Sequence, residues 1–405
     1  MNSVLLDKRI RTYIDSLHLM NDQPSAATPG KEPEEELHWL ALRLVPGLGN
    51  RLAKRLVDTL GSATDVFRAS SSELESLRVP SHVIRNLSTG TVFEGAIREV
   101  EQARQLGIRL LTIREADYPP LLKEIFDPPL VLYVRGELAL LRAPAVAVVG
   151  TRRTTPYGRA MAERLAADLA SRGLVIISGL ARGVDAVAHR ATLDIGGKTV
   201  AVLGNGADVI YPSENKKLFD RIVEQGAIVS EFPLGSFPAP QNFPIRNRII
   251  SGLSLGVVVV EAAQHSGALI TARLAMEQNR EVFAIPGSLT NPCSWGPHVL
   301  IKQGAKLVQD WQDVVEELPA EVRQQLFASS DATKPPEGAS LFAESLSEQE
   351  RAIYNLLKVE EAIHLDEILD ALPQLSSSEV LVSLLELEFK NLVRQLPGKN
   401  FVKIF

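Results

Sequence analysis

The chain contains 405 residues, of which 45% are hydrophobic and 23% are charged, and its formal net charge at pH 7 is −6. This length allows two or three domains with buried cores, and the composition is that of a globular protein. A single cysteine, Cys293, excludes an internal disulfide and favours a reducing, cytoplasmic location. Because no apolar run approaches about 18 residues, we expect no membrane insertion.

Residues 1–36 are predicted to form an N-terminal extension that is disordered or holds one short helix. Its first part has apolar residues at the spacing of an amphipathic helix, namely Leu6, Ile10, Tyr13, Ile14 and Leu17. The stretch NDQPSAATPGKEPEEE that follows is polar and contains prolines, which is typical of disordered segments. Scattered charges near the N-terminus exclude the apolar centre of a signal peptide.

Residues 37–107 are predicted to form a small helical domain. From residue 108 to residue 318 the chain then alternates β-rich runs with helical segments. The runs AVAVV, LVIIS, TVAVLG, AIVS, GVVVVE and EVFAIPG are almost continuously apolar, as expected of strands that are covered on both faces. Repeated βα units of this kind predict an α/β fold with a doubly wound, mostly parallel sheet, which binds ligands at the carboxyl ends of its strands.

Between the first two runs, apolar residues recur every four positions and predict one helix with a buried stripe. The stripe consists of Tyr157, Met161, Leu165 and Leu169. Residues 319–345 are rich in Pro, Ser and Ala and are predicted to be a linker. Residues 346–405 begin with the capping box SEQE, continue with three helical patterns and end in an apolar strand pair, which together predict a winged-helix domain.

Two familiar phosphate-binding loops are excluded by their spacing. The dinucleotide-binding pattern G-x-G-x-x-G is broken in GNGADV, where Val209 replaces the third glycine. The P-loop pattern is broken before GGKT, where Thr192 stands in place of the first glycine. The lysine of GGKT also leads into a predicted strand, whereas a P-loop lysine leads into a helix.

Four other turns at strand ends are suited to bind an anion, because glycine allows close approach of the backbone and helix-start N–H groups point outward. In NFPIRNRIISG, Asn242 is expected to cap a helix whose dipole then disfavours the nearby arginines unless an anion is bound. The candidate phosphate-binding residues of the four turns are Gly150, Thr151, Arg152, Ser178, Gly179, Arg182, Gly183, Phe243, Arg246, Asn247, Arg248, Ser266 and Gly267.

Several titratable side chains near these turns have structural interpretations. Asp185 lies in a first helical turn and is interpreted as a dipole partner, and His189 as a core histidine. Glu231 and Glu261 end strands, where they can serve in catalysis or pair with the arginines of NFPIRNRIISG. No His, Cys or Asp cluster has the spacing of a metal site, and no cofactor is expected.

Taken together, these residues resemble the DprA/Smf DNA-processing protein family. The resemblance covers residues 118–318 through eight ordered motifs, which are YPPLL, VVGTRRTTPYG, ISGLARGVDAVAH, VLGNGADVIYP, FPIRNRII, SGALITA, FAIPGS and LIKQGA. It implies an extended Rossmann-like domain that binds single-stranded DNA and forms a homodimer. It also implies loading of the RecA recombinase onto that DNA during natural transformation.

The chain departs from the family pattern at three positions. The family's GSR is Gly150-Thr151-Arg152 here, and its frequent SGSLIT is SGALIT, so Ala268 lacks a hydroxyl. Trp295 stands where an arginine is common, so a cationic contact is not expected at this position, and stacking of the Trp295 ring is the alternative. Residues 145–318 contain 17 Lys and Arg against 16 Asp and Glu, so this domain is not acidic despite the net charge of the chain.

The segment LVPGLGNRLAKRLVDTLGS resembles a helix-hairpin-helix or SAM-like element. Its hairpin glycines would expose N–H groups to a DNA phosphate, so an auxiliary DNA contact and a purely structural role both stay open. The residues of this contact would be Gly47, Gly49, Arg51 and Lys54.

Two other functions compete with DNA binding by the α/β domain. Related Rossmann-like enzymes, the lysine-decarboxylase-like phosphoribohydrolases, carry a PGGxGT turn, and this chain has only IPGSLTN. We therefore favour a binding protein without catalytic residues over an enzyme. A transcription factor that acts through the winged helix is the third alternative.

Overall fold

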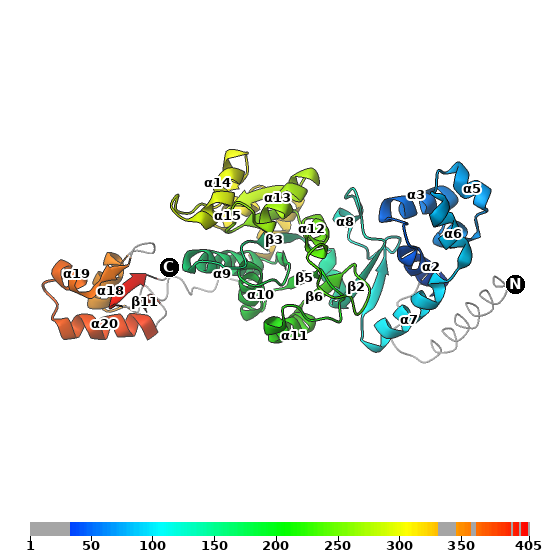
Figure 1. Ribbon diagram of the computed structural model, residues 1–405. Coiled ribbons are helices and arrows are strands. Elements are labelled where there is room, and N and C mark those ends of the chain that lie inside the picture. Colours follow the sequence, from blue (N-terminus) through cyan, green and yellow to red (C-terminus); the bar gives the residue numbers. More distant parts are fainter. Residues whose placement is uncertain (1–32, 331–345, 358–361, 390–391, 397, 404–405) are drawn as a thin grey trace.

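The computed structural model describes residues 33–330, 346–357, 362–389, 392–396 and 398–403 (Figure 1). The predicted amphipathic helix of the first 17 residues and most of the predicted disordered stretch lie outside these described residues. Within them, three parts follow one another along the chain. They are a helical domain, an α/β domain and a small C-terminal domain.

The N-terminal domain consists of six helices. They are α2 (Pro33–Leu44), α3 (Asn50–Leu60), α4 (Ala63–Arg68), α5 (Ser71–Ser76), α6 (Ser81–Thr89) and α7 (Val92–Gln105). The expected boundary at residue 36 was too late, because α2 begins at Pro33 and the glutamates of its first turn favour the positive end of the helix dipole. Buried side chains of this domain, such as Trp39 and Leu40, belong to the same hydrophobic core as one face of the α/β sheet.

A nine-stranded sheet forms the centre of the α/β domain, in the order β1-β2-β6-β5-β4-β3-β7-β8-β9. The strands are β1 (Arg109–Thr112), β2 (Val131–Gly136), β3 (Ala145–Val149), β4 (Val175–Ser178), β5 (Thr199–Leu203), β6 (Ala227–Ser230), β7 (Gly256–Val259), β8 (Glu281–Ala284) and β9 (Lys306–Leu307). Strands β3 to β9 are parallel, whereas β1 and β2 extend the sheet in antiparallel pairing. The mostly parallel sheet and its six predicted apolar strands, β3 to β8, are confirmed.

Helices cover both faces of this sheet, as a doubly wound fold requires. They are α8 (Pro120–Lys123), α9 (Pro156–Ser171), α10 (Val184–Asp194), α11 (Lys216–Gln225), α12 (Asn242–Gly252), α13 (Gly267–Glu277), α14 (Trp295–Lys302) and α15 (Trp311–Val315). Helices α9 and α10 pack on the face that holds Val146 and Val148, while α12 and α13 pack on the face of Ala147 and Val149. The predicted stripe of α9 is buried at its last three positions, and Tyr157 is half-buried.

The predicted linker begins with a helix, α16 (Ala320–Ser330). Val322 and Leu326 are one helical turn apart on α16 and pack against the core beneath α9, with Leu326 buried. The sequence prediction missed this helix because the overall Pro, Ser and Ala content of residues 319–345 is that of a linker. Val322 and Leu326 nevertheless pack on the existing core. The α/β domain therefore extends beyond residue 318.

The C-terminal domain has the predicted winged-helix fold and its own hydrophobic core. Its elements are α18 (Glu348–Leu356), β10 (Ile363–His364), α19 (Leu365–Ala371), α20 (Ser377–Phe389), β11 (Val393–Leu396) and β12 (Asn400–Lys403). The capping box is present, since the Ser347 hydroxyl accepts from the Glu350 N–H and the Glu350 carboxylate accepts from the Ser347 N–H. A short third strand, β10, joins the predicted strand pair.

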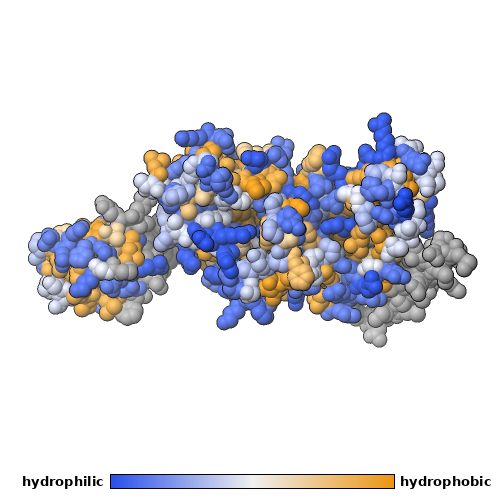
Figure 2. All heavy atoms as spheres, viewed as in Figure 1, coloured by the Kyte–Doolittle hydropathy of each residue, from blue (hydrophilic) through white to orange (hydrophobic). Residues whose placement is uncertain are grey.

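On the face that Figure 2 shows, hydrophilic and hydrophobic residues are intermixed on the surface of the described chain. None of the helices within the described ranges combines the length and the apolar character that crossing a membrane requires.

Candidate functional site

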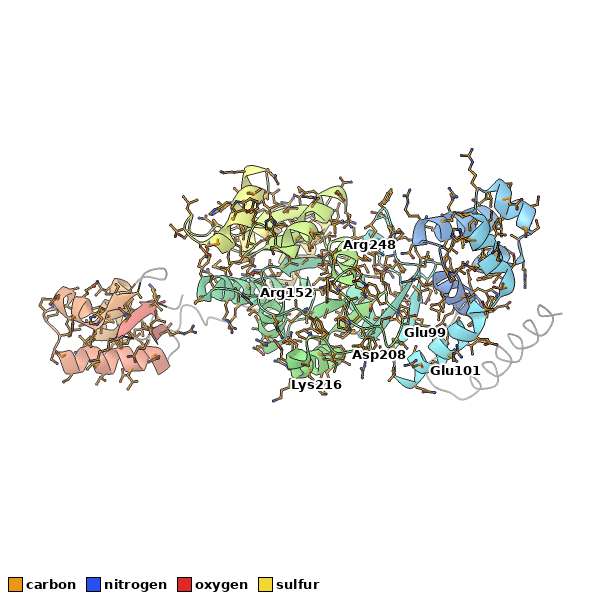
Figure 3. The ribbon with its side chains drawn as sticks, in the orientation of Figure 1. Glu99, Glu101, Arg152, Asp208, Lys216 and Arg248 are labelled. Atoms are coloured by element: carbon orange, nitrogen blue, oxygen red, sulfur yellow. The ribbon has the colours of Figure 1, made fainter. Side chains whose placement is uncertain are left out.

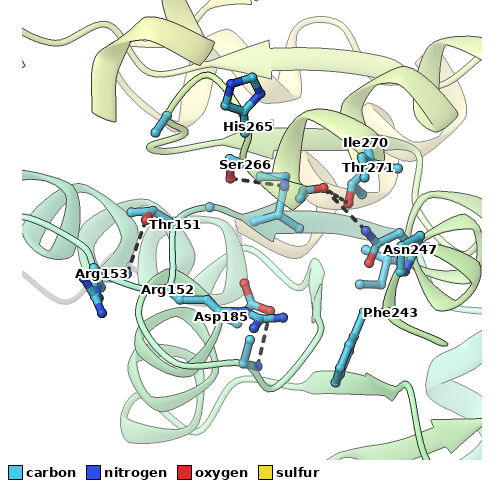
Figure 4. A pocket seen from close by; sticks show the side chains of 18 of the residues that line it. Thr151, Arg152, Arg153, Asp185, Phe243, Asn247, His265, Ser266, Ile270 and Thr271 are labelled. Carbon is cyan, nitrogen blue, oxygen red and sulfur yellow. Dashed lines mark hydrogen bonds between the residues drawn. The ribbon is translucent and has the colours of Figure 1, made fainter. Parts of the chain in front are cut away.

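A cavity of about 920 Å³ opens at the carboxyl ends of β3 and β7. The strand order reverses here, because the strand that follows β3 in the chain, β4, lies on one side of it and β7 lies on the other. Ligands of doubly wound folds bind at such a topological switch point. We call this space the strand-end cavity. Figure 4 shows its walls, which come from the turn after β3, from α12 and from the start of α13. The predicted residues that line it are Gly150, Thr151, Arg152, Phe243, Arg246, Asn247, Ser266 and Gly267.

The turn after β3 is fixed by backbone hydrogen bonds. The Thr151 N–H donates to the Glu261 carbonyl at 2.7 Å, and the Thr151 carbonyl accepts from the Val184 N–H at 3.2 Å. Arg152 and the following Arg153 are exposed at the cavity mouth, and neither forms an ion pair with any part of the chain that the structure describes. Two unpaired guanidinium groups therefore face the cavity.

The turn between β4 and α10 does not offer its N–H groups to an external anion, contrary to the sequence prediction. The Asp185 carboxylate accepts from the Gly179 and Ala181 N–H groups at 3.1 and 3.3 Å, so the chain supplies the anion itself. Ser178 is buried, and its hydroxyl donates to the Val148 carbonyl. Burial raises the pKa of Asp185, and the nearby Arg246 guanidinium opposes that shift.

The two other predicted residues of this turn have different surroundings. Gly183 adopts a φ of +73°, and a Cβ at this position would collide with the Thr151 carbonyl. Gly183 does not line the strand-end cavity. Arg182 is exposed and pairs with Glu214 at 2.5 Å. It lines a small adjoining space of about 40 Å³ together with Gly179 and Arg152.

Helix α12 brings one arginine to the cavity and keeps it buried. Asn242 is the first residue of α12 and not its cap, because Gln241 holds the capping position without a side-chain hydrogen bond. The Arg246 guanidinium lies against Gly179, where a Cβ would collide with it, and donates to the Val202 carbonyl at 2.5 Å. Burial lowers the pKa of Arg246 to about 10. Arg246 thus contributes positive charge from behind the cavity wall.

Arg248 is not part of the cavity, which corrects the sequence prediction. Its guanidinium pairs with Glu231 at 2.5 Å and with Asp127 at 3.6 Å. Figure 3 shows Arg248 on the side toward the N-terminal helices, away from Arg152. Its charge is therefore compensated by carboxylates within the protein, and the anion that we inferred from the helix dipole is not needed.

Helix α13 begins at the cavity. The Ser266 hydroxyl caps it by accepting from the Ala268 N–H at 3.3 Å. The Asn247 amide donates to the Gly267 carbonyl at 3.4 Å and so connects α12 to this helix start. Phe243 and Pro244 of the first turn of α12 also line the cavity, so the positive ends of the α12 and α13 dipoles both lie at it.

Aromatic rings add a second kind of surface. The Phe243 ring lies 5.3 Å from the Arg152 guanidinium carbon, and its centroid is 5.8 Å from that of Tyr211. Trp295 also lines the cavity and is 41% exposed. Of the other aromatic residues near these turns, Tyr157 donates its hydroxyl to the Pro286 carbonyl and lies outside the wall.

Some lining residues were not predicted as site residues, namely Arg153, Tyr211, His265 and Thr271. Tyr211 lies within the motif VLGNGADVIYP, and His265 directly precedes SGALITA. The motifs were therefore the signal from which both residues could have been predicted as site residues. Arg153 adjoins Arg152 in the same motif. Thr271 lies inside the motif SGALITA, so the same signal was available for it.

The carboxylates that could serve in catalysis are engaged in the structure. Glu261 accepts from the Thr154 hydroxyl at 2.9 Å and from the Thr155 N–H at 3.0 Å, and neither it nor Glu231 lines the cavity. His189 is a core histidine, as predicted, and burial lowers its pKa to about 3. The described residues contain no group of His, Cys, Asp and Glu able to hold a metal ion.

The helix-hairpin-helix residues lie at the start of α3. Gly47 has a φ of +83° and Gly49 occupies the N-cap position, so the turn has the expected backbone. Lys54 pairs with Asp58 at 2.8 Å, and the Arg51 guanidinium lies 3.7 Å above the exposed Phe126 ring. Both cations therefore already have partners on the surface, which favours the structural role of this element.

Comparisons with known proteins agree with the motifs. A family model described as DNA recombination-mediator protein A matches residues 109–319, and one described as DprA winged helix domain matches residues 334–399. Protein Smf of Synechocystis is 35% identical over 392 residues, which are 91% of this chain and 98% of that protein. Protein Smf of Escherichia coli is 54% identical over 202 residues, so the match spans about half of each chain (50% and 54%).

A solved structure agrees as well. The X-ray structure of DNA processing protein A from Streptococcus pneumoniae has a TM-score of 0.57 and 37% identity, and the match covers 70% of this chain and 98% of that one. Two family models, a relative that is matched over nearly its full length and a solved structure thus point to one group of proteins. The chain belongs to the family of DNA recombination-mediator protein A, whose members are also named DprA or Smf.

Proposed function

We propose that the chain binds single-stranded DNA in the strand-end cavity and loads RecA recombinase onto it during natural transformation. The observation that carries the DNA part is the pair of unpaired guanidinium groups, Arg152 and Arg153, beside two helix starts and exposed rings. Arginines and helix starts bind backbone phosphates, while aromatic faces bind unpaired bases. One polymer, a single strand, presents both kinds of group.

The cavity suits a single strand better than a duplex. Its wall contains the aromatic residues Tyr211, Phe243 and Trp295. Only an unstacked base can lay its face on such a ring. Stacking of one base on an aromatic side chain contributes about 1–3 kcal/mol, and a base pair inside a duplex keeps its faces covered. The phosphate contacts fall to Arg152 and Arg153, with Arg246 adding charge from within the wall.

Catalysis is not part of the proposed function. Glu231 is held by Arg248, and Glu261 by the two threonines at the start of α9. Neither carboxylate is free to act as an acid or base on a nucleotide in the cavity. This arrangement supports a binding protein over the phosphoribohydrolase alternative.

The recombinase and dimer parts of the proposal rest on the family. The matched family model is described as a recombination mediator, and such a protein must place a recombinase on the strand that it holds. The α/β domain also ends in an open edge strand, β9, with Leu307 exposed on it. An open edge with an apolar side chain is a surface on which a second copy can pair.

The test is binding of a labelled oligothymidylate and of a duplex of equal length, measured by fluorescence anisotropy over a range of salt concentrations. Arg152→Ala should weaken single-strand binding and flatten the log–log salt slope by up to about 0.7, the value for one phosphate. Lys198→Ala is the matched control, because Lys198 is an exposed cation that pairs with Glu137 away from the cavity. Wild-type affinity and slope for a folded Arg152→Ala variant would refute the assignment.

The recombinase part has a separate test. RecA filament formation on single strands coated with single-strand-binding protein should become faster when the chain is added. The Arg152→Ala variant should lose this effect in proportion to its loss of DNA affinity. No acceleration by a wild-type protein that binds DNA normally would refute RecA loading and leave DNA binding standing.

A further inference from the structure

One wall of the strand-end cavity is a loop between β6 and α12. We call this loop, residues 232–241, the rim loop. Its Pro238 and Pro240 line the cavity, and it leads directly into Phe243 on the first turn of α12. Together with Pro233, these prolines leave three positions of the rim loop without a backbone N–H group. The position of the rim loop therefore depends on the acceptors that its remaining N–H groups find.

Two carboxylates hold the rim loop at consecutive N–H groups. The Leu234 N–H donates to Glu99 Oε1 at 2.6 Å, and the Gly235 N–H donates to both carboxylate oxygens of Asp208 at 2.9 and 3.0 Å. Asp208 follows β5, whereas Glu99 belongs to α7 of the N-terminal helical domain. Figure 3 shows the two side chains close together, on the side of the α/β domain that faces α7. The helical domain thus supplies one of the two carboxylates.

Glu99 is itself fixed by the sheet. Tyr133 on β2 donates its hydroxyl to the same Oε1 atom at 2.9 Å. Tyr133 is buried, and burial raises the pKa of its hydroxyl, with the negative charge of Glu99 adding to the rise. The hydroxyl therefore keeps its proton at neutral pH and stays a donor. One oxygen atom of α7 connects a central strand to the wall of the cavity.

We infer that Glu99 is a positioning residue for DNA binding, through which the helical domain sets the wall of the strand-end cavity. The inference rests on the proposed function, since the cavity is the site proposed to hold the single strand. Glu99 does not line the cavity, so it acts through the rim loop and not by contact with DNA. A second contact supports the same role, because Arg43 of α2 donates to the Glu231 carbonyl at 3.5 Å, directly before the rim loop.

The charge of Glu99 and its acceptor oxygen predict opposite effects on DNA binding. Removal of a negative charge from a protein that binds a polyanion favours binding through electrostatics alone. Removal of the acceptor leaves the Leu234 N–H without its partner, so the wall is no longer held in place and binding weakens. Glu99→Gln removes the charge but keeps an amide oxygen that can accept from both donors. The alanine and glutamine variants therefore separate the two effects.

The test is anisotropy of a labelled oligothymidylate with variants of the full chain. Glu99→Ala should weaken binding by about fivefold or more, since stacking of one base corresponds to about five- to 150-fold in affinity. Its salt slope should stay at the wild-type value, because Arg152 and Arg153 lie on the turn after β3 and not on the rim loop. Glu99→Gln should bind as the wild type does. Glu101→Ala is the matched control, because it removes the same charge from an exposed position of α7.

Hydrogen exchange gives a second readout that needs no DNA. Amide protection of residues 232–241 should fall in Glu99→Ala and be retained in Glu99→Gln and Glu101→Ala, because the acceptor for the Leu234 N–H is lost only in the alanine variant at position 99. Circular dichroism checks that Glu99→Ala is folded. If it is not, Glu99→Met replaces it, since methionine has a similar length and favours helices but is a poor hydrogen-bond acceptor.

Three results would overturn the inference. They are wild-type affinity of the folded alanine variant, an affinity loss in Glu99→Gln or Glu101→Ala as large as in Glu99→Ala, and unchanged protection of the rim loop in Glu99→Ala. In each of these cases the wild-type chain still binds the single strand, so the proposed function stands. Absence of binding by the wild-type chain would reject the proposed function, and this inference with it.

Discussion

Replacement of Arg248 by alanine separates a structural role from a DNA-binding one. The substitution leaves the Glu231 carboxylate, whose side chain is 3% exposed, without its partner at 2.5 Å. Removing one member of a buried ion pair costs about 3–5 kcal/mol of unfolding free energy. Two features place the expected loss of unfolding free energy at the lower end of this range. Arg43 still approaches the Glu231 carbonyl at 3.5 Å, and protonation of an ordinary glutamate at pH 7 costs only about 4 kcal/mol.

We therefore expect Arg248→Ala to lower the free energy of unfolding by about 3 kcal/mol, measured by urea denaturation at pH 7. Arg153→Ala is the control, because this arginine is exposed and its loss should change stability by less than about 0.5 kcal/mol. The double variant Arg248→Met, Glu231→Gln should recover most of the loss, since no buried charge remains. Single-strand affinity below the unfolding transition should stay at the wild-type value.

Two results would refute this reasoning. A stability loss under about 1 kcal/mol would mean that the Glu231 carboxylate does not depend on Arg248. A folded Arg248→Ala variant with the affinity loss of Arg152→Ala would place Arg248 in the DNA site after all.

Four further predictions concern the remaining sites. Trp295→Ala should weaken single-strand binding by about 1–3 kcal/mol in the anisotropy assay, whereas Trp295→Phe should keep most of the affinity, because stacking needs only an aromatic face. Burial lowers the pKa of His189 to about 3 from 6.5, so below pH 6.5 only the unfolded chain takes up a proton at this residue. The free energy of unfolding should therefore fall as the pH drops below 6.5, and urea titrations of His189→Gln should show a flatter dependence on pH. Purified protein should release neither base nor phosphate from AMP or ATP above the level of a Glu231→Gln, Glu261→Gln variant; release above it would restore the enzyme alternative. Deletion of residues 346–405 should change single-strand affinity less than tenfold at constant oligomeric state, because the removed domain is acidic.

The central sheet could be predicted from the sequence because its strands are buried on both faces. Strands β3 to β8 are therefore continuous apolar runs, and each run is too short to be a buried helix. Strand β9 has two residues and β1 begins with Arg109, so neither gives such a signal. Strand β2 lies in the apolar run LVLYV and gives the same signal as β3 to β8, which the sequence prediction did not use. The first turns of α16 were missed for a similar reason, since Val322 and Leu326 are the apolar anchors among the side chains that the structure describes there.

The candidate site could be predicted only in part, because position along the chain shows which residues follow a strand but not which partners they find. Arg152 and Arg248 both lie in motifs that follow strands. The fold brings Glu231, 17 residues away in the sequence, against Arg248, and within the described residues it brings no carboxylate into an ion pair with Arg152. The turn before α10 was misinterpreted for the same reason, because the anion that fills it is Asp185 of the same turn. Side-chain pairing of this kind depends on tertiary packing.

The tethered carboxylate of Asp185 has a consequence for selectivity. In many doubly wound proteins a glycine-rich turn between a strand and a helix holds the phosphate of a nucleotide, and such a turn would fill with the free nucleotides that are abundant in any cell. Here the Gly179 and Ala181 N–H groups are already satisfied, so an isolated nucleotide gains nothing from them. Under the proposed function, a ligand has to gather weak contacts from several walls of the cavity at once, and a polymer does this better than its monomers. The filled turn thus protects the site from competition by small metabolites.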